Sequence, residues 1–272
     1  MAGYNIGGSK VFSSRTGQRT RVGFLDEARG LCIILMVLYH GLFNVIFLFG
    51  WDVTLSDGTQ LLYALWQMPA MRFAQPFVAG IFIFISGIAC RYSRSNLKRG
   101  AIVLALGLCI TAATLYFMPA QAIYFGILHF MGSAMIIFAL LSRVLDKIPP
   151  SLCFLLCAFI FALTVNIPIG FFGLSGVWTL SVPTEWMNIG WLIPLGFTAA
   201  GADHFPLLPW LFLFLAGSCL GVAFVQRDMP SLFYRNRSRF LAATGRRTIY
   251  IYLLHQPVLL GLMYGIDFIL GR

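Results

Sequence analysis

The chain has 272 residues, of which 59% are apolar and only 10% are charged, and its mean hydropathy is +0.85. This composition excludes a water-soluble globular protein, because no soluble domain of this size needs so many apolar residues, and it indicates an integral membrane protein. The formal net charge of +10 does not by itself indicate binding to nucleic acid, because basic residues of membrane proteins usually mark the cytoplasmic loops.

The first 22 residues are polar, basic and rich in glycine and serine. They lack the continuous apolar core of a cleaved signal peptide. We therefore expect 1–22 to form a cytoplasmic tail and 23–272 to form a single transmembrane domain.

Seven apolar runs approach or exceed the roughly 20 residues that a helix needs to cross the hydrocarbon core. With the tail inside, nearly all basic residues of the loops face the cytoplasm. The apolar segment 187–200 is short and contains Pro194, and an eighth crossing there would turn the arginine-rich stretch 227–247 outward. The sequence predicts an all-α membrane bundle of about seven crossings with an outer re-entrant or interfacial segment. The predicted crossings are 30–49, 73–90, 101–118, 123–141, 151–168, 206–225 and 248–269.

The stretch LDEARGLCIILMVLYH at 25–40 leads into the first predicted crossing and overlaps it, and it carries Arg29 near one end and His40 at the other. Eleven residues make three turns plus about 20° and rise by roughly 16 Å, so the two side chains face the same way. Asp26 lies one turn before Arg29 and can orient the guanidinium by pairing with it. The stripe indicates either an anion-binding mouth joined by an apolar slot to a base, or two polar ends that anchor a helix.

Acylated coenzyme A would fit such a slot, because it has phosphates at one end, an extended arm in the middle and a thioester at the tip. Arginine side chains suit phosphate because they can form paired hydrogen bonds. Ordinary placement of basic residues in cytoplasmic loops also accounts for most of these charges. The candidate phosphate ligands at the inner mouth are Arg29, Arg91, Lys98, Arg99, Arg246 and Arg247.

Four histidines lie within predicted crossings or at the start of one, in the middle or outer half of the membrane. Ionisable groups are costly there, so their shared depth indicates a functional site. Each one could instead form a hydrogen bond to a neighbouring helix. His129 stands in the glycine-flanked stretch FGILHFMG, and His255 stands beside Pro257, which should kink the last helix.

Asp203 and His204 stand just before the sixth predicted crossing, in ADHFPLLPW. A carboxylate there could bind a cationic amine or orient a histidine. It could also cap the helix that follows.

The six cysteines fall inside or at the edges of apolar runs, without a CxxC pair or a His/Cys cluster at metal-ligand spacing. We expect them to be packing residues and predict no metal site. They are Cys32, Cys90, Cys109, Cys153, Cys157 and Cys219.

Over nearly its whole length the sequence resembles the family of the catalytic domain of heparan-alpha-glucosaminide N-acetyltransferase, including its bacterial members. The Arg29-to-His40 spacing and the closing YLLHQP also resemble the wider group of membrane acyltransferases that O-acylate surface polysaccharides. The stretches that carry the family resemblance are LDEARGLCIILMVLYH (25–40), PFVAGIFIFISG (76–87), LKRG (97–100), FGILHFMG (125–132), DHFPLLPW (203–210) and GRRTIYIYLLHQPV (245–258).

The resemblance implies a membrane enzyme that passes acetyl from cytoplasmic acetyl-CoA to a sugar on the far side of the bilayer. It implies that His40 is catalytic with Arg29 as its partner. His255 or His129 could polarise the carbonyl or orient His40, and the sequence does not choose between them. The expected acceptor is a glucosamine-like amino sugar, and O-acylation of a surface polysaccharide is the alternative. The residues assigned to the acceptor are Asn44, Asp203 and His204.

His40 could remove a proton from the acceptor as it attacks the thioester, or could itself carry the acetyl group. A small-solute transporter is the alternative from another class, although none of the nine acidic residues falls at mid-membrane. The expected partners are acetyl-CoA, a saccharide acceptor and the bilayer, without nucleic acid, and a homodimer is left open. The expected location is a bacterial inner membrane with the N-terminus in the cytoplasm.

Overall fold

The computed structural model describes residues 22–198, 201, 203–226 and 229–271. In this part of the chain seven helices are long and apolar enough to cross a membrane, which confirms the predicted all-α membrane bundle. The predicted tail lies outside the described residues except for Val22, so its place stays a prediction. The seven spans are Gly23–Leu48, Pro69–Cys90, Asn96–Phe117, Ile127–Leu145, Pro150–Ile169, Leu207–Gln226 and Thr248–Leu270.

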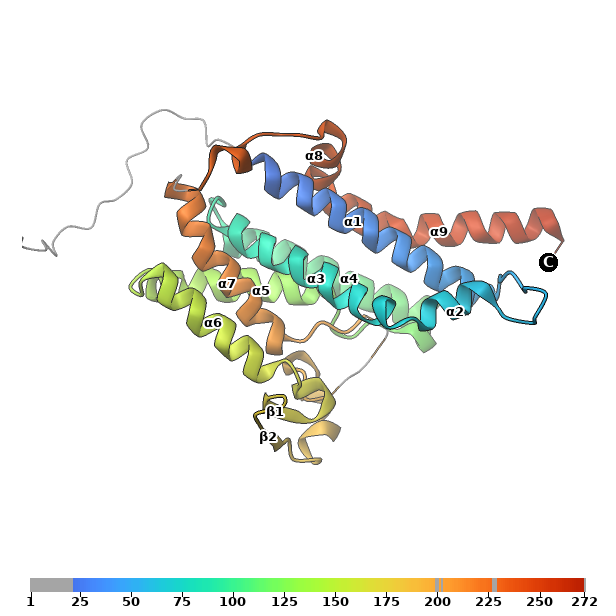
Figure 1. Cartoon of the computed structure of the whole chain (residues 1–272), viewed down its shortest axis with the longest axis horizontal. Helices are drawn as coiled ribbons and strands as arrows, with labels where there is room; N and C mark the ends of the chain where they lie inside the picture. The colour runs from blue at the N-terminus through green and yellow to red at the C-terminus, as the bar shows by residue number, and fades with distance from the viewer. Residues whose placement is uncertain (1–21, 199–200, 202, 227–228, 272) are drawn as a thin grey trace, which may run out of the picture.

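The spanning helices run roughly side by side, and two short helices lie at their ends (Figure 1). The first helix begins at Gly23 rather than at residue 30, so the charged stretch LDEAR belongs to the helix itself. The α-helices are α1 (Gly23–Phe43), α2 (Leu61–Gln67), α3 (Pro69–Cys90), α4 (Asn96–Phe117), α5 (Ile127–Leu145), α6 (Pro150–Thr164), α7 (Leu207–Gln226), α8 (Arg239–Arg246) and α9 (Thr248–Leu270).

The segment between α6 and α7 does not cross the membrane in its described part. It forms an antiparallel hairpin, β1 (Phe171–Leu174) and β2 (Trp178–Ser181), in which Phe171 pairs with Ser181. Two 3₁₀ turns follow, at Trp186–Asn188 and Gly190–Leu195. The prediction that 187–200 is no crossing is confirmed for 187–198, whereas the hairpin was not predicted.

Three helix pairs pack closely through glycines that face each other: α1 with α8, α3 with α7, and α4 with α5. A Cβ on Gly245 of α8 would overlap the backbone carbonyl of Asp26 in α1, and a Cβ on Gly87 of α3 would overlap that of Phe214 in α7. In a membrane, helices gain from such close contact because small residues let the backbones pack tightly. These contacts fix how the helices sit around the interior.

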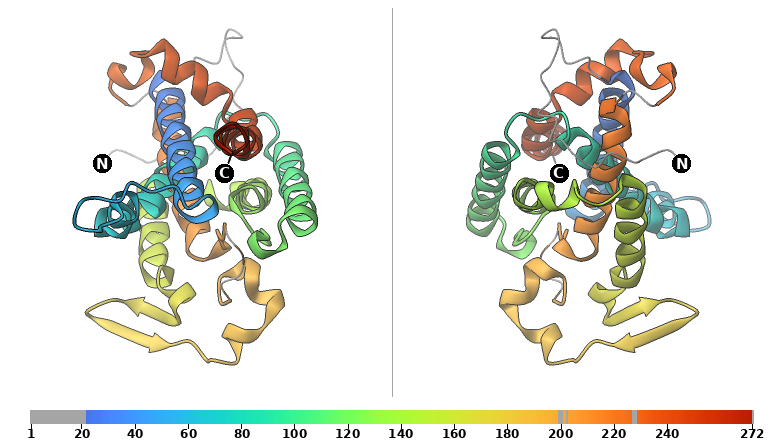
Figure 2. Two further views of the ribbon diagram at one scale, coloured as in Figure 1. Left: turned by 90° about the vertical axis from the view of Figure 1, so that its right-hand side faces the viewer. Right: turned by 90° about the vertical axis from the view of Figure 1, so that its left-hand side faces the viewer.

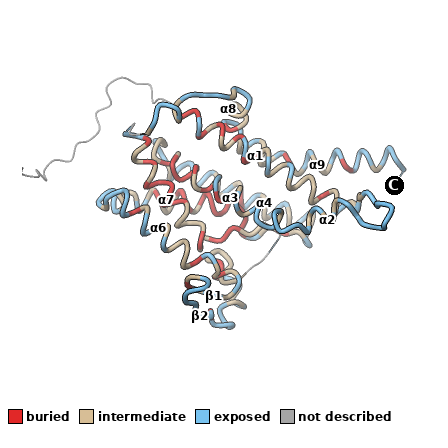
Figure 3. The backbone as a smooth tube through the Cα atoms, in the orientation of Figure 1, coloured by how far each residue is buried: buried red, intermediate tan, exposed pale blue. Residues whose placement is uncertain are grey.

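The buried core lies mainly on α5 and α7, while α1 and α9 have far fewer buried residues (Figure 3). Phe130 of α5, Phe214 of α7 and Ile83 of α3 are fully buried. Seen end-on, α1 and α9 lie beside each other on one side of this core (Figure 2). The space between the core and these two peripheral helices holds the main cavity.

The expectation that the cysteines only fill space is wrong for Cys153 and Cys219. These residues form a disulfide that joins α6 to α7. Sequence reasoning missed the pair because 66 positions separate the two residues, and only the contact between the helices brings them together.

Candidate active site

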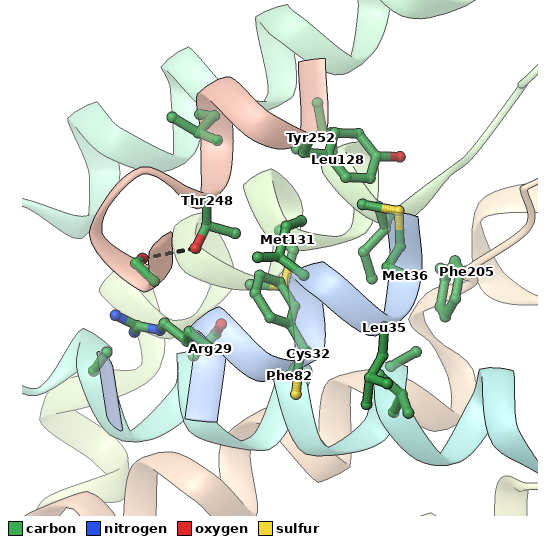
Figure 4. Close-up of a pocket in the computed structure, with 18 of the residues that line it drawn as sticks. Arg29, Cys32, Leu35, Met36, Phe82, Leu128, Met131, Phe205, Thr248 and Tyr252 are labelled. Atoms are coloured by element: carbon green, nitrogen blue, oxygen red, sulfur yellow. Dashed lines mark hydrogen bonds between the residues drawn. The ribbon is translucent and has the colours of Figure 1, made fainter. Parts of the chain in front are cut away.

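A cavity of about 1080 Å³ extends along α1, with walls from α3, α4, α5 and α9. Arg29 and His40, which were predicted to share one face of the helix, both line it, and so do Ile33 and Met36 between them. In Figure 4, Arg29 lies toward one end and Tyr252 toward the other, with apolar side chains between them. The cavity therefore has a cationic end, an apolar middle and an end that carries an imidazole.

At the cationic end, three arginines line the described part of the cavity: Arg29, Arg99 and Arg246. A single carboxylate, that of Asp26, lies among them, 3.9 Å from Arg29 Nη1 and 4.0 Å from Arg246 Nη1. The predicted pairing of Asp26 with Arg29 is thus present. Three guanidinium groups around one carboxylate leave an excess of positive charge, which suits a phosphate-bearing ligand.

The position of Arg246 depends on how α8 is held against α1. Ser238 caps α8 by accepting a hydrogen bond from the backbone N–H of Leu241 at 3.2 Å. Glu27 of α1 accepts from the N–H of Ser238 at 2.7 Å and also from that of Arg237. Glu27 is therefore a buried residue that holds the turn before α8 against α1. The sequence did not predict this role.

The structure does not bring Arg91, Lys98 or Arg247 to the described wall of this cavity. The side chain of Arg91 instead pairs with Asp146, donates to the carbonyl of Ser218 at 2.9 Å, and lies over the ring of Phe138. Lys98 and Arg247 are exposed near the ends of their helices. The sequence predicted six basic residues at the cytoplasmic end of the helices from their depth in the membrane. Depth alone does not show toward which neighbour a side chain points.

At the opposite end, His40 lines the cavity with its ring fixed by its own helix. Its Nδ1 lies 2.9 Å from the carbonyl oxygen of Met36. Because a carbonyl only accepts hydrogen bonds, Nδ1 is the donor, and Nε2 of the neutral ring carries a lone pair. The nitrogen that is free to react is therefore Nε2.

His255 of α9 lies beside His40, with the two ring centroids 5.1 Å apart. Its Nδ1 lies 2.6 Å from the carbonyl of Tyr252, so it has the same tautomer as His40. Its Nε2 is buried and has no hydrogen-bond partner among the described residues. The two imidazole rings therefore lie next to each other where α1 contacts α9, and each ring has a lone pair on Nε2. Of these two residues, His40 lines the described cavity.

Asn44 lies one turn after His40 and is completely buried. Its Nδ2 donates to Gln256 Oε1 at 2.8 Å, while its Oδ1 has no partner within the described structure. We refer to His40, Asn44, His255 and Gln256 as the polar seam between α1 and α9. Sequence reasoning missed Gln256, although a polar residue next to a buried histidine in an apolar span is itself a signal.

His129 lies elsewhere and is fully engaged. Its Nδ1 accepts from the N–H of Gly126 at 3.2 Å, so Nε2 carries the proton and donates to Thr111 Oγ1 at 3.0 Å. It ties α4 to the start of α5 and is not part of the described cavity wall. Of the two histidines expected to assist His40, the structure places only His255 beside it.

The two outer candidates, Asp203 and His204, have different surroundings. Asp203 lines the cavity, and its Oδ2 accepts from Tyr252 Oη at 3.0 Å and from the N–H of Ile127, at the start of α5, at 3.3 Å. It therefore caps α5 rather than the helix that follows it in sequence. His204 Nε2 donates to the carbonyl of Ile193 at 3.0 Å and holds the outer 3₁₀ segment, away from the described cavity wall.

The family model described as heparan-alpha-glucosaminide N-acetyltransferase, catalytic, matches residues 21–257. This range contains all the residues that line the cavity and the whole polar seam. Searches of curated proteins and of solved structures gave no significant match.

Proposed function

The chain belongs to the heparan-alpha-glucosaminide N-acetyltransferase catalytic family, and from this premise we propose that it moves acetyl from cytoplasmic acetyl-CoA to an amino sugar on the outer side. One observation carries the proposal: a single cavity joins three arginines to the free Nε2 of His40. A purely structural bundle does not need such a path.

The basic end of the cavity suits the phosphates of coenzyme A. Arg29, Arg99 and Arg246 would bind them, with Asp26 holding two of the guanidinium groups in place. The rise of roughly 16 Å from Arg29 to His40 along the helix then lets the apolar arm lie along the slot. The thioester would reach the imidazole end.

The acceptor would bind at the wall formed by Asp203 and Tyr252, close to the polar seam. The carboxylate of Asp203 attracts a cationic amine and can accept hydrogen bonds from sugar hydroxyl groups. This favours an amine over the alternative hydroxyl acceptor. Asn44, which the sequence assigned to the acceptor, does not line the described cavity. It would instead support the site by its hydrogen bond to Gln256, which joins the end of the first span to α9.

In this mechanism His40 is the general base. The amine that binds as a cation first releases one proton to water, and the neutral amine is the nucleophile. His40 Nε2 then accepts a second proton from the nitrogen as the nitrogen bonds to the acetyl carbonyl carbon, and this proton passes to the sulfur as the carbon–sulfur bond breaks. The products are the acetamide and free coenzyme A. His255 stabilises the transient imidazolium, because its Nε2 lone pair can accept a hydrogen bond from a protonated neighbour.

The test is binding of acetyl-CoA to the purified chain in detergent, followed by release of free thiol in the presence of glucosamine. Arg29→Ala should weaken binding by roughly 1.5–3 kcal/mol, the usual value of a hydrogen bond to a charged group. His40→Ala should keep binding and slow turnover by about 10²–10⁴-fold. His204→Gln, altered outside the cavity, is the matched control and should behave like the parent chain.

Normal thiol release by His40→Ala would remove His40 from the reaction. A complete lack of acetyl-CoA binding would reject the proposal and favour a transporter. Release of coenzyme A before acceptor is added would point to an acetyl-histidine intermediate instead of direct transfer.

A further inference from the structure

Three cysteine thiols meet in the contact between α6 and α7, away from the main cavity. Cys153 and Cys157 lie one turn apart on α6, and Cys219 faces them from α7. The three sulfur atoms all lie within 4.8 Å of one another, and all three residues are buried. The disulfide joins Cys153 to Cys219 and leaves Cys157 beside it as a free thiol.

The spacing suits a thiophilic metal ion once the disulfide is reduced. Residues four apart on a helix point to the same side, so α6 presents two ligands to one point. Around tetrahedral zinc, Zn–S bonds of about 2.3 Å place the sulfur atoms roughly 3.8 Å apart. The three sulfur atoms, all within 4.8 Å of one another, therefore lie on the scale that one zinc ion requires.

A second cavity, of about 490 Å³, reaches two of the three cysteines. Cys153 and Cys219 line its wall, together with Asp146 and Gln226 near the ends of their helices. The cavity has room for water, which could complete a coordination shell. The cluster is therefore buried but not sealed.

Arg91 and Asp146 form an ion pair in the wall of the same cavity. Arg91 also donates to the carbonyl of Ser218, the residue before Cys219, so it links α3 to α7 next to the cluster. The cavity that reaches the cluster therefore has a polar wall.

We propose that Cys153, Cys157 and Cys219, when reduced, bind one Zn²⁺ ion, with a water molecule as the fourth ligand. A small-molecule thiol reduces the disulfide and is itself oxidised to its disulfide. The three cysteine thiols then release three protons as the ion binds. The resulting zinc–thiolate group carries one negative charge, and the ion replaces the disulfide as the link between α6 and α7.

Zinc is the expected ion because thiolates prefer soft and borderline cations to Mg²⁺ or Ca²⁺. In the orientation proposed for acetyl transfer, these sulfurs lie at the same end of the bundle as Arg29, toward the reducing cytoplasm, where disulfides are rare. The site itself does not depend on acetyl transfer, so failure of either proposal leaves the other testable.

The experiment uses the full chain in detergent, treated with a phosphine reductant and then with Zn²⁺, with bound metal counted after removal of the excess. We expect one Zn²⁺ per chain. Cys157→Ser should weaken binding by at least about tenfold, since losing even an outer hydrogen-bond partner of a zinc ligand costs 10–100-fold. Cys109→Ser, at an exposed thiol on α4, is the control and should bind like the parent.

Equal zinc binding by the parent and Cys157→Ser would overturn the proposal. It would show that Cys157 is not a zinc ligand and only packs beside the disulfide. X-ray absorption of the zinc-loaded parent chain tests the site without any variant. It should show three sulfur ligands at about 2.3 Å. A shell of only nitrogen and oxygen ligands would reject the site.

Discussion

His40 owes its reactive nitrogen to its own helix. The bond from Nδ1 to the carbonyl of Met36 leaves the lone pair of His40 on Nε2, and His40 lines the cavity. The bond from His255 to Tyr252 likewise leaves a lone pair on Nε2 of the neighbouring ring, which lies outside the described cavity wall. The sequence predicted that Arg29 and His40 share a face, since that follows from helix geometry alone. It could not choose between His255 and His129, because contacts between helices decide which of them lies beside His40 and which one bonds to Thr111 instead.

If His255 accepts a hydrogen bond from protonated His40, His255→Gln should lower kcat. General acid–base contributions of 10²–10⁴-fold set the scale, and we expect a loss of at least about 10²-fold. The KM for acetyl-CoA should change little, because His255 is not part of the described cavity wall. Steady-state kinetics that vary acetyl-CoA at saturating glucosamine separate the two constants. A raised KM with an unchanged kcat would contradict this role.

Among the elements, α8 shows how a short helix can position a binding residue. Its glycine contact with α1 and the clamp of Glu27 on the preceding turn hold Arg246 near Asp26. The sequence marked 227–247 only as an arginine-rich loop, because a helix of eight residues that begins and ends with arginine is too short and too polar to give a membrane signal. The hairpin between α6 and α7 escaped prediction for a similar reason, since most of its side chains are exposed and show no alternation.

Gly245→Ala should destabilise the chain, because the new methyl group would overlap the backbone of α1 at Asp26. Overpacking of this kind costs about 1–3 kcal/mol. Separation of α8 from α1 should also displace Arg246 and weaken acetyl-CoA binding. Thermal unfolding in detergent and an acetyl-CoA titration measure the two effects.

Gly261→Ala on α9 is the matched control. A Cβ there meets no described atom within 4 Å, so both stability and binding should stay unchanged or stability should rise slightly. Equal melting temperatures for the two variants would show that the α1–α8 contact is looser than described.

For the whole molecule, the described residues contain seven helices that are long and apolar enough to cross a membrane, and an odd number of crossings predicts that the two ends of the chain lie on opposite sides. With basic residues inside, we expect the N-terminus in the cytoplasm and the end of α9 outside. The donor would then enter from the arginine end and the acceptor from the end near Asp203.

Alkaline phosphatase fused after Arg272 should be active in a bacterial host, and a fluorescent protein fused there should be dark. Fusions at the loop between α3 and α4 should give the reverse result and serve as the internal control. Cytoplasmic behaviour of the C-terminal fusion would reverse the orientation and with it the side from which acetyl-CoA enters.

The sequence by itself determined that the chain is a membrane bundle, where it crosses, and that Arg29 and His40 lie on one stripe. Hydropathy and the helix repeat are local properties, so they can be read along the chain. Only the tertiary structure decided that Arg99, Arg246 and Asp203 share the cavity with that stripe and that Arg91 does not. It also brought Cys219 of α7 to Cys153 and Cys157 of α6. These relations depend on which helix faces touch, and that choice is made by packing between segments far apart in the sequence.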